Sequence, residues 1–471
     1  MRIHLLWIGS LFTYILTIAF PLCALAKDHS SKRGPMTPLL NNVTGQYETF
    51  EGAEREAFGE FLYRAAAKWG NGNVWIPNPK VWVQYESGLG ERSAVDFENG
   101  VGRIQLLIFA ADDPYSDGVK AHLEQGVRNL VLAEPKDPIE MIRGQESLGS
   151  KKGKKMPSGT NHKSYNGSGI YEVKKRDSLW KIAEKFNVSI KIIAQMNNIS
   201  KDATLQIGQK LLVPEPSPHP LKLDKKPKPN ALDPLLLGQI RMSDGRLVSR
   251  DILPDYAREL VQSQDFRVEK IKGADGTERL AVTLEFQLIP EHFEVRAKRY
   301  RPIVQDNAKK YSIYPPLIFA VIHTESAFNP RARSGTPAYG LMQLVPRGGA
   351  RDAHRMIHGK DRLLTPKYLY KPKNNIELGT AYLHILANRY MKPVNDPTSR
   401  MYCAIAAYNA GAANVGYALI GSKSMRKAIP TINRIEPEAV YVKLTQSLPF
   451  KESRSYVKKI RDRIPLYARW K

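Results

Sequence analysis

One glutamate stands at an unusual place on a predicted helix. Residues 315–330 read PPLIFAVIHTESAFNP, where the two prolines favour a helix start and the Asn-Pro pair favours its end. Apolar residues recur at helical spacing along this segment, and one turn further the same stripe reaches Glu325. Burial disfavours the charged form of a carboxyl group and so raises its pKa. A glutamate that stays protonated near neutral pH can act as a general acid, and cleavage of a glycosidic bond needs such an acid.

The stripe alone leaves a second interpretation open, in which Glu325 turns toward solvent or caps a neighbouring backbone group. Spaced motifs around Glu325 favour the interpretation of this residue as a buried general acid. They are ESxFNP at 325–330, GLMQ at 340–343, NIxxGxxYL at 375–383, AYNAG at 407–411 and ESRxYV at 452–457. In this order the motifs resemble the lysozyme-like catalytic domain of the lytic transglycosylases, over residues 293–471.

The resemblance implies that Glu325 is a single catalytic acid and base. It would protonate the oxygen between MurNAc and GlcNAc, then take the proton of the MurNAc 6-hydroxyl as that oxygen attacks C1, giving a 1,6-anhydro product. Asp352, Asp361 and Glu377 follow, but none lies in a motif typical of a nucleophile, and Glu377 is interpreted as structural. Ordinary glycosidases use two carboxylates, so a lone acid favours assistance by the substrate.

The motif positions also give a set of predicted substrate-binding residues. They are Ser326, Ser334, Gly340, Met342, Gln343, Tyr408, Asn409 and Tyr456. The glycine is expected to let a sugar approach closely, and the glutamine to offer hydrogen bonds. The resemblance implies that Tyr408 and Asn409 line sugar sites, that Ser334 contacts an acetamido group and that Tyr456 hydrogen-bonds the catalytic carboxylate. Met342 is expected to pack in the wall of the cleft. Ser326 either steadies the acid or the next turn, or is a surface hydroxyl. No metal-ligand spacing or phosphate loop occurs here, so no metal or other cofactor is predicted.

A compact unit at residues 169–214 has the predicted order βααβ. An alternating strand opens it, two amphipathic helices follow, and the turn IGQ leads into a last strand. The residues Tyr171, Val173, the run DSLWKIA, the pair Asn197-Asn198 and IGQKLLVP resemble a LysM domain. This resemblance implies a module that binds GlcNAc-containing polymers and carries no catalytic group.

The regions on either side, 51–146 and 231–292, are predicted to be two parts of one α+β domain with the LysM unit inserted between them. Asn99-Gly100 and Asp244-Gly245 are hairpin signals between alternating apolar runs. The strands resemble the N-terminal domain of the membrane-bound lytic murein transglycosylase C group. A role in positioning or substrate binding and a plain scaffold both remain open.

The N-terminus indicates export. Arg2, an apolar run and an Ala-Leu-Ala site form a predicted signal peptide at 1–26, followed by a linker at 27–50. An uncleaved membrane anchor and lipidation at Cys23 are the alternatives, although Leu22 is not the small residue that a lipoprotein signal prefers. The predicted location is the periplasm of a Gram-negative bacterium, with attachment to the outer or inner membrane left open.

The net charge of +25 indicates an anionic partner, but charge alone does not identify it. The linkers at 147–168 and 215–230 are rich in lysine and supply part of the excess. Export and the absence of a recognition motif argue against nucleic acid.

The sequence thus predicts a multidomain α+β protein with a mostly α-helical lysozyme-like C-terminal domain, a βααβ LysM module and an α+β N-terminal domain. The predicted function is that of a peptidoglycan lytic transglycosylase acting on glycan strands in cell wall remodelling. A hydrolytic muramidase of the same fold and an inactive wall-binding scaffold are the alternatives. Endo or exo cleavage and the oligomeric state are left open.

Overall fold

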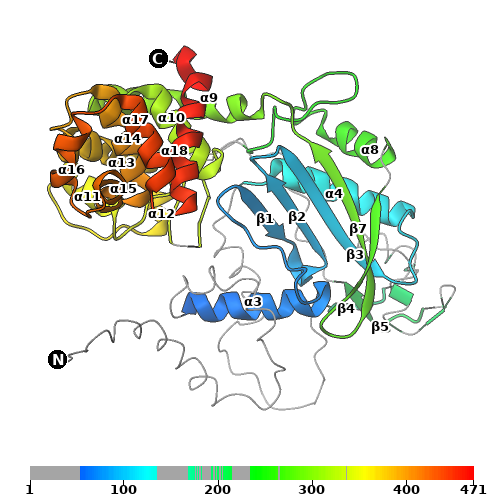
Figure 1. Cartoon of the computed structure of the whole chain (residues 1–471). Helices are drawn as coiled ribbons and strands as arrows, with labels where there is room; N and C mark the ends of the chain where they lie inside the picture. Colours follow the sequence, from blue (N-terminus) through cyan, green and yellow to red (C-terminus); the bar gives the residue numbers. More distant parts are fainter. Residues whose placement is uncertain are drawn as a thin grey trace, which may run out of the picture.

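The computed structural model describes residues 53–134, 168–174, 210–214, 234–263, 266–335 and 337–470, together with some positions between 177 and 209 (Figure 1). The predicted signal peptide, the segment 27–50 and the linker at 215–230 lie outside these residues, as does the linker at 147–168 except for Ser168. A sheet-containing part and a helical part lie side by side, and the predicted fold class is confirmed (Figure 1).

An antiparallel sheet of five strands organises the first part, in the order β1-β2-β3-β7-β6. The strands are β1 (Val81–Tyr85), β2 (Glu91–Asp96), β3 (Val101–Phe109), β6 (Arg267–Lys272) and β7 (Glu278–Gln287). The predicted Asn99-Gly100 turn joins β2 to β3, and Gly100 has a φ of 69°, which favours glycine. β3 pairs with β7, so strands from both sides of the LysM segment share one sheet.

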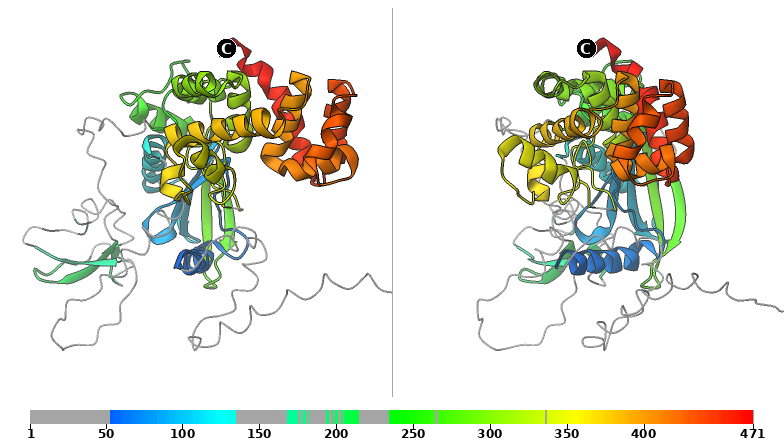
Figure 2. Two further views of the ribbon diagram at one scale, coloured as in Figure 1. Left: turned by 90° about the vertical axis from the view of Figure 1, so that its left-hand side faces the viewer. Right: turned by 60° about the vertical axis from the view of Figure 1, so that its left-hand side comes forward.

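Helices cover both faces of this sheet. Strand side chains alternate between the faces. Val95, Ile104 and Leu284 pack with α4 (Asp117–Leu132) and α8 (Leu253–Ser263) on one face. The opposite face packs against α3 (Ala53–Trp69), which lies at the end of the sheet that points away from the helical part (Figures 1 and 2). A short 3-10 helix, η1 (Ser87–Leu89), connects β1 to β2.

The second part is helical. It contains α9 (His292–Tyr311), α10 (Pro315–Ser326), α11 (Gly349–His358), α12 (Pro366–Leu369), α13 (Pro372–Ile385), α14 (Pro397–Ala410), α15 (Ala412–Ile420), α16 (Met425–Ile432), α17 (Pro437–Ser447), α18 (Lys451–Arg463), the π-helix η2 (Leu386–Tyr390) and the 3-10 helix η3 (Ile464–Trp470). α10 is buried along most of its length and packs against α9, α18 and η3. It is therefore the central helix of this part.

In the LysM segment, β4 (Ser168–Glu172) pairs antiparallel with β5 (Lys210–Pro214). Apolar side chains between and on the strands form a small core of their own. The Asn197 side chain closes the unit, since it accepts a hydrogen bond from Leu212 N at 2.6 Å and donates one to Leu212 O at 2.7 Å. The predicted helices of this unit lie largely outside the described residues.

Among the described helices, no single one combines the length and apolar character needed to cross a membrane. The neighbours α14 and α15 reach that length together, with a bend of 120° between them, and both contribute buried residues to the helical core.

Candidate active site

Glu325 lies on the last turn of α10. Pro315 and Pro316 occupy the first helical positions, as the sequence predicts. The helix ends at Ser326, and the two residues that follow, Ala327 and Phe328, have φ angles of 48° and 63°. Two successive non-glycine residues in this region are strained and persist only where packing enforces them.

Packing holds this turn on both sides. The Phe328 ring is fully buried in the helical core, whereas Ala327 is buried in the core of the sheet domain. Arg296 on α9 is fully buried and donates a hydrogen bond from Nε to Ala327 O at 3.1 Å. Its other nitrogen atoms bind Gln239 Oε1 and Phe97 O in the sheet domain. Both parts of the molecule therefore fix the turn that carries the glutamate.

The surroundings of Glu325 favour its protonated form. Burial raises the pKa of this carboxyl group to about 8, and the nearby Glu452 carboxylate acts in the same direction. The Tyr456 hydroxyl and the Lys80 ammonium group oppose the shift. Glu325 keeps partial contact with solvent. It therefore combines accessibility with the protonation state that a general acid needs at neutral pH.

Two tyrosines stand beside this carboxyl group. Tyr456 on α18 is buried, and its hydroxyl meets no regular hydrogen-bond partner among the described residues, yet it lies close enough to Glu325 to favour the charged carboxylate. Tyr408 on α14 is half-buried and donates a hydrogen bond from its hydroxyl to Met342 O at 2.8 Å. Burial, and next the charge of Glu325, raise the pKa of both phenols well above the usual value. Both tyrosines are neutral donors beside the acid.

The GLMQ loop is held from behind by Asn375 on α13. This asparagine is fully buried; it accepts a hydrogen bond from Met342 N and donates to Tyr339 O and Leu369 O, each at 2.8 Å. A β-carbon on Gly340 would come within 2.5 Å of the Asn375 amide nitrogen and 2.7 Å of Leu369 O. Gly340 was expected to make room for a sugar, and this expected reason for a glycine at position 340 is wrong. The glycine makes room for this amide and adopts a φ of 76°.

Met342 and Ser326, both predicted as substrate-binding residues, are buried. Met342 is fully buried, and its sulfur packs where a side chain on Gly379 would otherwise lie. Ser326 is fully buried too, with its hydroxyl 2.8 Å from Leu341 O and 3.0 Å from Ile322 O. Neither side chain is free to contact a substrate, and Ser326 is not a surface hydroxyl. Ser326 instead joins the end of α10 to the GLMQ loop, and Met342 packs that loop against α13.

The remaining predicted residues keep solvent contact. Gln343 is half-buried, with its amide nitrogen 3.0 Å from both Ala332 O and Gly340 O, while its amide oxygen meets no partner among the described residues. Ser334 is half-buried in the loop after α10. Asn409 is exposed, and its side-chain oxygen accepts a hydrogen bond of 2.6 Å from the buried Ser453. These side chains have surfaces that a ligand can reach.

The three acidic side chains that follow Glu325 in the sequence analysis are engaged in ion pairs. Asp361 pairs with Arg351 at 2.5 Å, Asp352 with Arg355 at 3.1 Å and Glu377 with Lys310 at 2.7 Å. His323, two residues before the acid, is buried and bound to the Tyr467 hydroxyl, and burial lowers its pKa to about 2, so it stays neutral. Among the described residues, no group of three histidine, cysteine or acidic side chains is suited to a metal ion.

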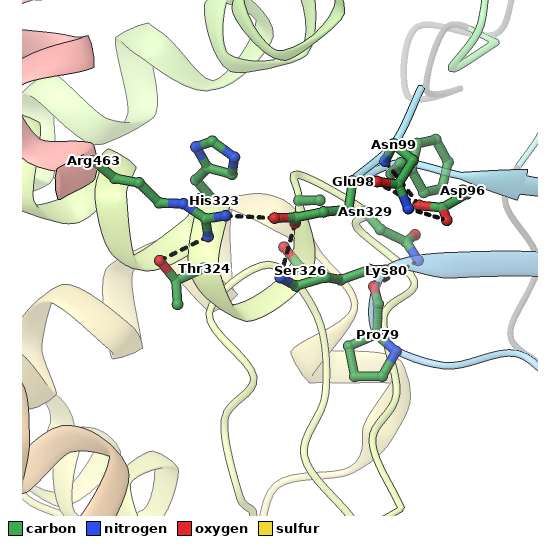
Figure 3. Close-up of polar contacts among 12 residues, drawn as sticks. Pro79, Lys80, Asp96, Glu98, Asn99, His323, Thr324, Ser326, Asn329 and Arg463 are labelled. Carbon is green, nitrogen blue, oxygen red and sulfur yellow. Dashed lines mark hydrogen bonds and ion pairs between the residues drawn. The ribbon is translucent and has the colours of Figure 1, made fainter. Parts of the chain in front are cut away.

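Sequence reasoning missed the contribution of the sheet domain (Figure 3). Asn329 Nδ2 donates to Pro79 O at 3.2 Å, and Lys80 Nζ pairs with Glu98 at 2.8 Å. Glu98 also binds Arg463 on α18, which donates to Thr324 Oγ1 at 3.0 Å (Figure 3). Asn329 belongs to a recognised motif. Pro79 and Glu98 carry no local signal, because their partners Asn329 and Arg463 lie 250 and 365 residues away along the chain.

Comparison with known proteins agrees with these observations. Residues 302–429 match the Transglycosylase SLT domain, and residues 171–214 match the LysM domain. Membrane-bound lytic murein transglycosylase C of Serratia proteamaculans is 34% identical over 412 residues, which cover 87% of this chain and 88% of that protein. Its counterpart in Yersinia enterocolitica is 34% identical over 446 residues, covering 92% and 97%.

A solved structure, the 70 kDa soluble lytic transglycosylase of Escherichia coli, aligns with 36% of this chain and 24% of its own, at 28% identity and a TM-score of 0.28. The family assignment rests instead on the two relatives that match along most of their length. The chain belongs to the membrane-bound lytic murein transglycosylase C family.

Proposed function

We propose that this protein cleaves the β-1,4 bond between MurNAc and GlcNAc in peptidoglycan and forms 1,6-anhydro-MurNAc. The observation that carries the proposal is the partly accessible Glu325 at the end of the central helix, where burial raises the pKa of its carboxyl group to about 8. A second catalytic group could come from the carboxylates Asp352, Asp361 and Glu377. Each of them forms an ion pair with a lysine or an arginine. Glu452, whose charge acts on Glu325, is exposed on α18, and no described carboxylate forms a close pair with Glu325. A single acid in the site suits a reaction in which a substrate hydroxyl acts as nucleophile.

In the first step, Glu325 gives its proton to the glycosidic oxygen as the bond from C1 to that oxygen breaks, and GlcNAc leaves as an alcohol. The positive charge left at C1 is met by the 6-hydroxyl oxygen of the same MurNAc. Glu325, now a carboxylate, takes the proton of that hydroxyl, so it ends the cycle protonated and no water is consumed. The tyrosine and lysine beside it favour the carboxylate, whereas burial favours the acid, and a residue that serves in both roles needs both influences.

We assign substrate contact to the side chains that retain exposure around Glu325, namely Ser334, Gln343, Tyr408 and Asn409. The amide oxygen of Gln343 is buried, so the assignment of this residue rests on the part of its side chain that stays exposed. Tyr456 is assigned to the carboxylate itself. Ser326, Gly340 and Met342 act as positioning residues that hold the GLMQ loop against α10 and α13.

We further propose that the LysM unit binds the glycan, that peptidoglycan strands are the partner, and that the enzyme works in the periplasm with membrane association through its N-terminus. The match to a LysM domain supports the first part. The membrane-bound relatives, which are named for action on murein, support the rest.

Mass spectrometry of muropeptides released from purified peptidoglycan tests the proposal, with Glu325→Gln as the matched variant. Products that end in anhydro-MurNAc, absent with the variant, are expected. Products one water heavier would identify a hydrolytic muramidase on the same acid. No release by the parent protein, with wall binding retained, would identify a binding scaffold and overturn the proposal.

A further inference from the structure

A second polar pocket lies in the sheet domain, remote from Glu325. It has a volume of about 170 Å³ and is lined by Trp69, Trp75, Arg92, Arg103, Arg267 and Glu269, among others. Trp69 ends α3, which lies at the end of the sheet that points away from the helical domain (Figures 1 and 2). About 13 Å of β2 separates Arg92 from Asp96, beyond which Glu98 contacts the helical domain. The pocket is therefore distinct from the candidate active site.

Arg92 at the base of this pocket is a buried cation without an anion. Only 3% of the residue is exposed, and its guanidinium plane lies between the rings of Trp69 and Trp75, at 3.6 Å and 3.9 Å from their centroids. It donates to neutral acceptors, among them Gln105 Oε1 at 2.8 Å, and no described carboxylate lies within 4.0 Å of it. A buried charge is ordinarily paired, whereas the carboxylate whose charge acts on Arg92, that of Glu269, forms no ion pair with it.

The rim of the pocket adds further positive charge. Arg103 stacks toward the Trp75 ring at 5.5 Å and pairs with Glu285, while Arg267 on the edge strand β6 pairs loosely with Glu269 at 3.4 Å. Three arginines (Arg92, Arg103 and Arg267) thus face two carboxylates (Glu269 and Glu285), so one positive charge of the cluster remains. Guanidinium groups bind carboxylates through paired hydrogen bonds, and the indole ring offers an apolar wall beside them.

We propose that this pocket binds a carboxylate group of a peptidoglycan fragment. The choice of fragment rests on the proposed function, because a wall-cleaving enzyme meets carboxylates on the peptide stem and, where the stem has been removed, on the lactyl group of MurNAc. Either carboxylate balances the positive charge that remains, with the solvent-accessible Arg103 and Arg267 as its direct donors, and the volume suffices for a few heavy atoms beyond it. The sheet domain then holds the wall while the helical domain cuts it.

Tryptophan fluorescence of the full chain carrying Glu325→Gln tests this, since Trp69 and Trp75 line the pocket and the probe is not cleaved. The probes are the free tetrapeptide stem, stem-free glycan with free lactyl groups, and inorganic phosphate. We expect a saturable change with one of the two carboxylate probes. Arg103→Ala combined with Arg267→Ala should weaken that binding at least tenfold, and Arg246→Ala, an exposed arginine on a distant turn, should leave it unchanged.

The two carboxylate probes separate the sources, since the tetrapeptide alone identifies the stem and the stem-free glycan identifies the lactyl group. Equal affinity for phosphate would reduce the pocket to an unspecific anion site and overturn the proposal. So would binding that the paired arginine substitutions leave unchanged in a protein with an unaltered unfolding temperature. The binding test does not depend on cleavage. Absence of binding would therefore overturn the pocket proposal without affecting the assignment of Glu325, and absence of cleavage by the parent protein would not affect the pocket proposal.

Discussion

Arg463 Nη1 donates a hydrogen bond of 3.0 Å to Thr324 Oγ1, one residue before the candidate acid. The same guanidinium group binds Glu98 in the turn after β2, and Glu98 in turn pairs with Lys80 at 2.8 Å. A network of ion pairs and one hydrogen bond thus connects the end of α18, the sheet domain and the end of α10 (Figure 3). The orientation of the acid depends on both domains.

Replacing Arg463 by methionine should lower kcat by about 10- to 100-fold, because small displacements of a catalytic group have effects of this size. The substitution keeps a long apolar side chain and removes both hydrogen bonds. Steady-state kinetics on soluble glycan strands measures the effect. Arg461→Met is the control, since that arginine pairs with Glu438 at the surface. Equal kcat values for the two variants would contradict the role of the interdomain contact.

Activity should fall as the pH rises through about 8, because the first step needs protonated Glu325. Lys80→Met removes a positive charge and raises the pKa of the acid, so the alkaline limb of the kcat profile moves to higher pH. Tyr456→Phe, which removes a donor to the carboxylate, acts in the same direction. Glu452→Gln removes a negative charge and moves the limb to lower pH. If all three substitutions moved the alkaline limb of the kcat profile in the same direction, this electrostatic account would be refuted.

Glu325→Gln should change how the free energy of unfolding depends on pH. The folded protein binds more protons than the unfolded chain between the ordinary pKa of 4.5 and the folded value of about 8, so raising the pH through this range lowers stability. Glutamine does not titrate. The variant is therefore expected to be more stable than the parent at pH 9, with a difference that shrinks toward pH 4.

Denaturant titrations at several pH values measure this dependence. Glu377→Gln is the matched control, because that carboxylate lies in a partly exposed ion pair with Lys310. Parallel pH profiles for the parent and Glu325→Gln would mean that Glu325 is not protonated in the folded protein at neutral pH.

Asn375→Ala should destabilise the protein by roughly 2–4 kcal/mol, because three buried backbone groups lose their hydrogen-bond partner. Denaturant unfolding measures this loss. Asn374→Ala is the adjacent control, since that side chain is half-buried and makes one hydrogen bond of 3.2 Å to Tyr368 O. A difference of less than 1 kcal/mol between the two variants would show that the GLMQ loop does not depend on the Asn375 amide.

Local patterns in the sequence predicted the helix that carries Glu325, its proline start, the Asn99-Gly100 turn and the LysM strands, because period, caps and turn residues act over a few positions. Side-chain roles that depend on distant partners were not predictable in this way. Gly340 was assigned to the substrate although its neighbour is Asn375 on another helix. The position of Lys80 beside the acid, and the stack of Trp69, Arg92 and Trp75, depend on how separate segments pack together, which no local pattern encodes.

The pairing of β3 with β7 also constrains how the protein is made. Arg103 and Glu285 are bonded neighbours, although 182 residues separate them along the chain. While the ribosome adds those residues, one edge of β3 has no strand to pair with, and an unpaired edge can recruit foreign strands. The LysM strands, by contrast, have their partners within 168–214. During translation the inserted unit can therefore complete its own sheet while its host domain still waits for β7 to leave the ribosome.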